Sequence, residues 1–496
     1  MTNYEKYKAH CRKITDINLA AGVLHWDQEV NMPPKGAGFR AQQLATLSGI
    51  SHELSVDHEY GNLLQTLDGD STLSEDQRRN VELSLKDYRK SLKYTTDFVK
   101  EHSISVSEAF QAWNQAKKEN NFSLFQPKLE KLVALKRQEC ELLGYTEHPY
   151  DALLDQYEPD TKTSDIEAVF KEVKAKLVPF VKELMAQPQN DEAFMYQSFD
   201  ENKQWDFGID LLKQMKYDFE AGRQDRSSHP FSIHFSPLDA RVTTRIDENN
   251  LNEMIWSCIH EGGHALYEQG ILTENYGLPL GETISLGIHE SQSRLWENNV
   301  GRGLPYWKAN FNTLQSYFPD ELKGVDAEAF YKAMNVVKPS LIRTNADELT
   351  YHFHVMIRFE IEKALIEGSI EVKDLPTLWN AKYKEYLNID VPTDSEGVLQ
   401  DIHWSHGSFG YFPTYSLGSF YATQFYAQAK KEINGLEQEI ENGNMQPLLD
   451  WLRTKVHQHG KRYSAQGLCQ RITGEKLRFE PFMQYAEKKY KALYNL

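Results

Sequence analysis

Apolar residues recur at helical spacing along most of this chain, and this spacing is the strongest constraint on its fold. After Ser74 the repeated positions are Val81, Leu85, Tyr88 and Leu92. A repeat of three to four residues predicts one buried face of an α-helix. Similar stripes predict a helix that ends near Leu143-Gly144 and another that begins at Thr163. The predicted fold class is therefore mostly α, and the 40% hydrophobic content is enough for a large buried core.

One segment departs from the helical pattern. Residues 230–246 are rich in Phe, Ile, Val and Thr with partial alternation, and Ser236-Pro237-Leu238-Asp239 is a predicted turn within them. Alternating β-branched and aromatic residues around a turn predict a short antiparallel β hairpin. Because this segment ends just before the most informative helix of the chain, we expect the hairpin to line a cleft.

Charge and cysteine content exclude several classes of protein. The chain carries 55 Lys and Arg against 72 Asp and Glu, a formal net charge of −17, which repels a nucleic-acid backbone. No apolar run approaches the roughly 20 residues that span a bilayer, and the N-terminus lacks the apolar stretch of a signal peptide. The cysteines, none with CxxC spacing, are Cys11, Cys140, Cys258 and Cys469. We therefore expect a cytoplasmic protein in a reducing compartment that binds neither nucleic acid nor membrane.

The sequence His260-Glu261-Gly262-Gly263-His264 is an HExxH pattern on a predicted amphipathic helix. The apolar stripe of that helix is Leu251, Met254, Ile255, Cys258, Ile259 and Leu266. His260 and His264 are four residues apart, so both imidazoles project from the same side and can bind one zinc ion. Glu261 projects about 100° around the helix, where it can act as general base for an attacking water. The alternative interpretation is a histidine pair on a solvated helix face.

A hydrolytic zinc site needs a third protein ligand. The extended HExxHxxGxxH pattern is absent, because position 267 is Tyr and position 270 is Gly. A downstream glutamate is the usual solution, and the candidates on a following helix are Glu282, Glu290 and Glu297. Spacing does not choose among these three. The glycines at 262 and 263 weaken a helix, which favours a role in close approach of a substrate or a neighbouring helix.

Six short motifs occur in order along the chain. They are HPF at 229–231, DxRxT at 239–243, HEGGH at 260–264, HESQSR at 289–294, IRxxAD at 342–347 and GxxQDxHW at 397–404. Together with Leu24-His25-Trp26-Asp27 and Met32-Pro33, they make the sequence resemble the carboxypeptidase Taq family of metallocarboxypeptidases. The motifs span nearly the whole chain. We expect residues 1–496 to form a single catalytic unit whose helical halves flank an active-site cleft.

The resemblance implies a role for each residue of the HExxH region. His260 and His264 would be metal ligands, Glu290 of HESQSR the third ligand, and Glu261 the general base. The implied fold is a large helical peptidase with a deep central cleft, similar to neurolysin and angiotensin-converting enzyme. The family is commonly homodimeric, and its expected ion is Zn²⁺, one per subunit, with Co²⁺ able to substitute.

Peptide hydrolysis also needs donors for the developing oxyanion. The region 403–415 resembles the tyrosine-bearing loop of related cleft peptidases, and its candidates are His403, His406, Tyr411 and Tyr415. We favour Tyr415 and His406, followed by Tyr411. The alternative interpretation is ordinary aromatic packing in a loop.

A carboxypeptidase must recognise a free C-terminal carboxylate, for which a bidentate arginine is best suited. Arg343 and Arg241 are the candidates, each within a family motif, although either could instead form a structural ion pair, for instance Arg343 with Asp347. His229 is expected to line the substrate channel or anchor the hairpin. Asp347, Gln400 and Asp401 complete the candidates: Asp347 and Gln400 for substrate binding, and Gln400 and Asp401 as partners that orient a histidine ligand.

These residues predict a metal-dependent carboxypeptidase that removes single C-terminal residues from peptides with broad specificity. A first alternative is an oligopeptidase or dipeptidyl carboxypeptidase on the same fold. A second is a metal-free helical interaction protein with an accidental HExxH. A third is a relative that binds peptides without cleaving them, against which the intact Glu261 argues.

Overall fold

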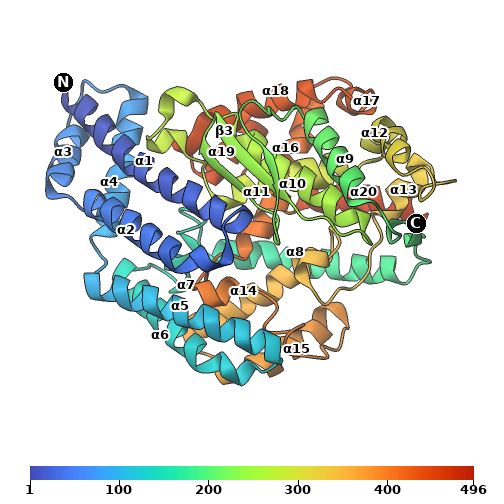
Figure 1. Ribbon diagram of the computed structural model, residues 1–496, viewed down its shortest axis with the longest axis horizontal. Coiled ribbons are helices and arrows are strands. Elements are labelled where there is room, and N and C mark those ends of the chain that lie inside the picture. Colours follow the sequence, from blue (N-terminus) through green and yellow to red (C-terminus); the bar gives the residue numbers. More distant parts are fainter.

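Helices make up most of the structure, as the helical spacing predicts (Figure 1). The computed structural model describes residues 1–496 apart from the side chain of Thr96. The α-helices are α1 (Asn3–Val30), α2 (Ala37–Ser55), α3 (His58–Asp68), α4 (Glu75–Ser91), α5 (Thr96–Glu119), α6 (Gln126–Leu143), α7 (Tyr150–Leu154), α8 (Thr163–Met185), α9 (Glu201–Gln214), α10 (Leu251–Glu268), α11 (Leu286–Arg294), α12 (Leu304–Tyr317), α13 (Ala327–Ala333), α14 (Tyr351–Glu367), α15 (Leu375–Leu387), α16 (Pro413–Glu432), α17 (Leu436–Glu441), α18 (Gln446–Lys455), α19 (Ala465–Thr473) and α20 (Glu480–Tyr494).

The predicted helix ends are confirmed by their caps. Ser74 is the N-cap of α4, and its hydroxyl accepts a hydrogen bond from the backbone N–H of Gln77, whose side chain in turn accepts from the Ser74 N–H. This reciprocal pair satisfies two otherwise unpaired donors at the helix start. Helix α6 ends at Leu143, where Gly144 takes a positive φ of 75°, and α8 begins at Thr163.

The predicted hairpin is confirmed and belongs to a three-stranded sheet. Strands β2 (Ser232–Ser236) and β3 (Asp239–Thr244) are antiparallel, with Ser232 opposite Val242. Strand β1 (Gln224–Arg226) adds in parallel to the other side of β3, so the sheet order is β1-β3-β2. The sequence did not predict β1, because three residues are too few to show alternation.

Helix α10 lies at the centre of the molecule and packs against β3, α9 and α11, while α11 packs against α16 (Figure 1). Its apolar stripe is part of the main hydrophobic core, in which Leu251, Met254 and Ile255 are fully buried. A second, smaller core lies where α1, α3 and α4 meet and contains Tyr7, Leu64 and Leu85.

The glycines of the HExxH pattern bring α10 close to its neighbours. A Cβ atom on Gly263 would lie 2.7 Å from the Cα atom of Ser293 in α11, and one on Gly262 would lie 2.7 Å from a methyl group of Leu212 in α9. Both distances are too short for real contacts, so close approach of neighbouring helices explains these residues.

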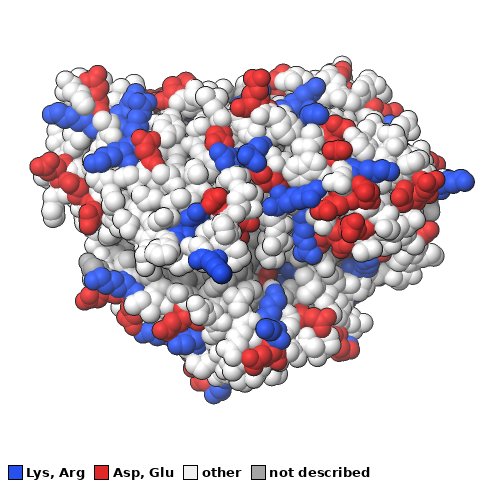
Figure 2. Space-filling model, in the orientation of Figure 1, with Lys and Arg blue, Asp and Glu red and all other residues white. Residues whose placement is uncertain are grey.

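Charge is dispersed over the face of the molecule shown in Figure 2, where Lys and Arg are interspersed with Asp and Glu and acidic side chains gather towards the right end. Among the helices of the described residues, none is both long enough and apolar enough to cross a membrane.

Candidate metal centre and active site

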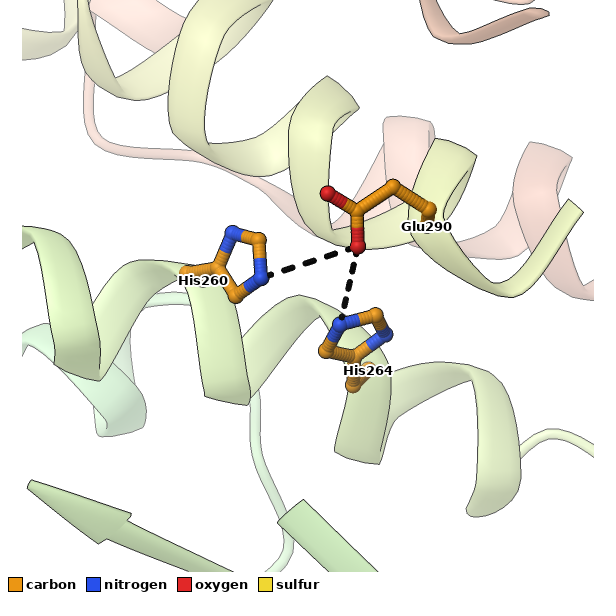
Figure 3. Close-up of side chains that lie close together, drawn as sticks. All are labelled: His260, His264 and Glu290. Carbon is orange, nitrogen blue, oxygen red and sulfur yellow. Dashed lines mark ion pairs between the residues drawn. The ribbon is translucent and has the colours of Figure 1, made fainter. Parts of the chain in front are cut away.

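His260, His264 and Glu290 converge on one point between α10 and α11 (Figure 3). Glu290 Oε2 lies 3.8 Å from His260 Nε2 and 3.5 Å from His264 Nε2. Helix periodicity projects both histidines from the same side of α10, and Gly263 allows α11 to approach closely enough for Glu290 to reach them.

The spacing of these atoms fits a metal ion. Ligands at about 2.0–2.1 Å from a tetrahedral zinc ion lie about 3.3 Å from one another, close to the distances in this structure. Two histidines and one glutamate also form a known catalytic zinc set that leaves a coordination position open. The three side chains can therefore hold a divalent metal ion.

A second carboxylate orients one of the histidines. Glu297 Oε2 lies 2.8 Å from His260 Nδ1, the ring nitrogen that faces away from Glu290. Arg294 joins the two carboxylates, since its Nε donates to Glu290 Oε1 at 2.7 Å and its Nη1 to Glu297 Oε2 at 3.0 Å. Arg302 Nη2 donates to the other Glu297 oxygen at 3.3 Å. Although burial opposes ionisation, these arginines and His260 hold the pKa of Glu297 well below its ordinary value.

The three candidate glutamates therefore occupy different positions. Glu290 lies with the histidines, whereas Glu297 sits in a π-helical turn, η6 (Leu295–Gly301), behind His260. π-Helical turns frequently occur at functional sites. Glu282 precedes α11, is exposed and pairs with Lys461, so the prediction that all three follow on one helix is wrong for Glu282.

His264 is held differently from His260. Its Nδ1 atom is buried without a hydrogen-bond partner among the described residues. Its ring instead stacks on His289, with centroids 4.4 Å apart and planes 25° apart. His289 Nε2 lies 2.8 Å from the buried carboxylate of Glu268, which also contacts His234 of β2 at 3.1 Å.

Glu261 is buried beside the metal ligands and lines the same cavity. Burial raises the pKa of its carboxyl group, and the nearby His260 opposes that rise. A carboxylate whose pKa is moved towards neutrality is better matched to proton transfer near pH 7.

A cavity of about 930 Å³ opens over this cluster. It joins the start of β2 with α10, α11 and the loops that follow α13 and precede α16. The residues predicted for the site that line it are His229, His260, Glu261, His264, Glu290, Glu297, Arg343, Asp347, Tyr411 and Tyr415. A long deep cleft like that of neurolysin stays a prediction.

Arg343 lies on the wall of this cavity, in the short helix η7 (Arg343–Asn345), and is 7% exposed. Its Nε donates to Asp401 Oδ1 at 3.0 Å, and its Nη1 donates to the Tyr351 hydroxyl at 2.9 Å. The suggested Arg343–Asp347 pair does not form. Asp347 instead accepts hydrogen bonds from Thr350 and from the backbone N–H of Leu349.

Asp401 and Gln400 hold arginines, not a histidine ligand. Asp401 Oδ2 accepts from Arg358 Nε at 2.6 Å, while Gln400 Oε1 accepts from the Arg343 N–H and from Arg358 Nη2. Two guanidinium groups thus share one carboxylate, whose pKa they hold far below its ordinary value despite burial.

The remaining predicted residues are not among the described side chains that line the cavity. Arg241 forms a bidentate pair with Asp239, at 2.8 Å for each contact, and stacks on Trp26 and Phe235. His403 Nε2 lies 3.2 Å from the Tyr415 hydroxyl. His406 is exposed and packs on Phe110.

Sequence reasoning missed the residues that hold the site in place. Arg294 lies four residues after Glu290, and residues of opposite charge at this spacing pair on a helix. The contact between them could therefore have been predicted from the sequence. Tyr351 and Arg358 carry no local signal, because each contacts residues that are distant in the sequence.

Known proteins share this architecture. The sequence profile of the family described as Carboxypeptidase Taq (M32) metallopeptidase matches residues 6–490. Carboxypeptidase 1 of Bacillus subtilis (strain 168) is 39% identical over 98% of this chain and 97% of its own length, and thermostable carboxypeptidase 1 of Thermus thermophilus is 38% identical over 99% of both chains. The crystal structure of M32 carboxypeptidase from Deinococcus radiodurans R1 has a TM-score of 0.98 at 37% identity and 100% coverage of both chains. The family resemblance is thereby confirmed: the chain belongs to the carboxypeptidase Taq (M32) family of metallopeptidases and is a metallocarboxypeptidase.

Proposed function

We propose that this metallocarboxypeptidase removes single C-terminal residues from peptides with broad specificity, with zinc as its ion and Glu261 as its general base. The observation that carries the proposal is the shared carboxylate of Asp401. Because two arginines contact this one aspartate, a unit of positive charge is left over. Arg358 is fully buried, so the cavity-lining Arg343 presents that charge to a bound peptide.

His260, His264 and Glu290 would hold the zinc ion. When bound, zinc supplies a Lewis acid that acidifies water and polarises the scissile carbonyl. Glu261 takes a proton from the attacking water and delivers it to the leaving amine. Burial of Glu261 beside the ligands supports this role. Co²⁺ is expected to substitute, because the ligand set does not discriminate strongly between the two ions.

Arg343 would bind the C-terminal carboxylate through charge-assisted hydrogen bonds. Its contacts with Asp401 and Tyr351 fix the guanidinium plane before substrate arrives, which lowers the entropy lost on binding. His229, Asp347 and Gln400 would support substrate binding from the cavity wall or behind it. Arg241, paired with Asp239 away from the cavity lining, is the weaker candidate.

Tyr415 and Tyr411 line the cavity and would donate hydrogen bonds to the developing oxyanion. His403 would act through its contact with the Tyr415 hydroxyl. His406 is exposed, packs on Phe110 and is not among the residues that line the cavity, which makes it the least supported member of this group.

Three broader properties belong to the same proposal. The chain would act in the cytoplasm, in line with four cysteines that are free and buried. It would form a homodimer, as the family resemblance implies. It would enclose its substrate in a deep cleft between helical halves, in line with the cavity over the metal ligands.

The products of one unblocked heptapeptide test this function. We expect mass spectrometry to show a ladder of peptides that shorten from the C-terminus by one residue at a time. Release of dipeptides, or cleavage inside the peptide, would contradict single-residue trimming and favour a dipeptidyl carboxypeptidase or an oligopeptidase. A panel of heptapeptides that differ in the last residue tests broad specificity.

A further inference from the structure

Glu362 lies behind the active site, in the middle of α14, and its side chain is fully buried. Three donors converge on its carboxylate: Trp404 Nε1 at 2.8 Å, the backbone N–H of Gly410 at 2.9 Å and the Tyr150 hydroxyl at 2.7 Å. Trp404 and Gly410 both belong to residues 403–412, which we call the 403–412 loop; it comprises the short helix η9 (His403–His406) and the turn that leads into α16.

All three partners of Glu362 are neutral donors, and both carboxylate oxygens are used. An uncompensated buried carboxylate is costly, and burial raises the pKa of Glu362 to about 7. The ionised carboxylate only accepts hydrogen bonds and therefore suits these three donors, whereas an amide would direct its own N–H₂ towards them.

Arg358 contacts the segment just before this loop from the same side of α14. It lies four residues before Glu362, so both side chains project from one face of the helix. Arg358 contacts Asp401 and Gln400, whereas Glu362 contacts Trp404 and Gly410. A cation and an anion on one helix therefore hold the 400–410 segment at both ends.

Gly410 directs the chain into the cavity. Its φ of 93° is accessible mainly to glycine, and a Cβ atom there would lie 2.7 Å from the carbonyl carbon of Leu153. The next residue, Tyr411, lines the cavity and packs between Tyr157 and Tyr415, with ring centroids 5.1 Å and 5.3 Å away. The hydrogen bond from Gly410 to Glu362 thus lies one residue from a side chain on the cavity wall.

We propose that Glu362 is a positioning residue, which holds the 403–412 loop so that Tyr411 and Tyr415 face the substrate. The inference rests on the proposed function, in which these tyrosines stabilise the oxyanion. Glu362 is not among the residues that line the cavity and contacts none of the metal ligands, so it acts on the loop through Trp404 and Gly410.

The first experiment compares Glu362→Gln with Glu360→Gln. Glu360 lies on the same helix but contacts Tyr386 and Lys382, away from the loop. We expect Glu362→Gln to lower kcat about 10- to 100-fold, the loss typical of a misplaced active-site group, with KM and metal content unchanged. Glu360→Gln should change kcat less than about twofold. A Glu362→Gln enzyme with wild-type kcat would overturn the proposal.

A second readout does not depend on activity. Fluorotyrosine placed at position 411 alone gives a ¹⁹F resonance that reports the surroundings of that ring. We expect this resonance to shift or broaden in Glu362→Gln and to stay unchanged in Glu360→Gln. An unchanged resonance in both variants would overturn the positioning role, even if stability falls.

The two readouts separate this inference from the proposed function. If the wild-type protein trims no peptide but the resonance still moves in Glu362→Gln, the function fails and the positioning role stands. If Glu362→Gln does not fold, Trp404→Phe removes one of the same hydrogen bonds and carries the test. In Trp404→Phe we expect the ¹⁹F resonance of position 411 to shift and kcat to fall, each by less than in Glu362→Gln. If neither quantity changes, the proposal is overturned.

Discussion

The two sides of the cavity are built differently. The metal side comes from elements that are close together in the sequence, α10, α11 and η6. Its carboxylates and arginines alternate in space as Glu290, Arg294, Glu297 and Arg302. The substrate side comes from segments that are far apart in the chain, and there Arg343 and Arg358 share the single carboxylate of Asp401. On the metal side two arginines are paired with two carboxylates, whereas on the substrate side two arginines share one carboxylate and a positive charge is left over.

The largest effect on catalysis should come from Glu261→Gln on the metal side. The amide cannot accept the proton of the attacking water, so we expect at least about a 1000-fold loss of kcat with full metal content. Steady-state kinetics and metal analysis of the same sample check this. Retained activity with full metal would remove Glu261 from the role of base.

Glu290→Gln should instead act on the metal itself. Loss of an anionic ligand leaves two histidines, and we expect metal affinity to fall by more than the roughly 10- to 100-fold typical of residues that orient a ligand. Titration with a chelator measures this affinity. Glu282→Gln is the matched control, because Glu282 is exposed and pairs with Lys461. If Glu290→Gln binds metal normally, the account of the metal side is wrong.

On the substrate side, Arg343→Gln should raise KM for a peptide with a free C-terminus. Truncation of one partner of a buried charge pair costs about 2–5 kcal/mol, which corresponds to a loss of kcat/KM of roughly 30-fold or more. Arg241→Gln should change kcat/KM less than about threefold, since Arg241 is paired with Asp239. Equal losses of kcat/KM in both variants would show that the positive charge left over at Asp401 does not bind the C-terminal carboxylate of the substrate.

The smallest effect on catalysis should come from Glu297→Gln, which weakens the orientation of His260 but leaves all three ligands in place. We expect metal affinity to fall about 10- to 100-fold with a smaller change in kcat, measured by chelator titration and steady-state kinetics. His264 has no such hydrogen-bond partner among the described residues. The metal affinity of a His289→Ala variant therefore tests whether stacking on His289 orients His264. Unchanged affinity in Glu297→Gln would contradict the orienting role.

This contrast also explains what the sequence could predict. The stripe from Leu251 to Leu266 and the spacing of His260 and His264 are local patterns, and the structure confirms the helix that they imply. The choice of Glu290 over Glu297 needed the family resemblance, because both lie on the same side of one continuous helical segment. In the structure Glu290 lies close to the Nε2 atoms of both histidines, whereas Glu297 contacts His260 Nδ1.

Contacts across long stretches of chain were beyond local reasoning. The pairing of Arg343 with Asp401, 58 residues later, could not be distinguished from a pair with Asp347 one helical turn away. Glu362 gave no signal at all, since its partners lie on α7 and in the 403–412 loop. Such residues support the site from behind, where only the tertiary fold brings them together.

The central claim is that one cavity contains both a metal site and an arginine that binds the C-terminal carboxylate of the substrate. The most direct test gives the wild-type enzyme one heptapeptide as the free acid and as its C-terminal amide, each with and without a chelator, and identifies the products by mass spectrometry. The account predicts stepwise loss of single residues from the free acid alone, abolished by the chelator. Equal internal cleavage of both peptides would keep the metal site but contradict the role of Arg343.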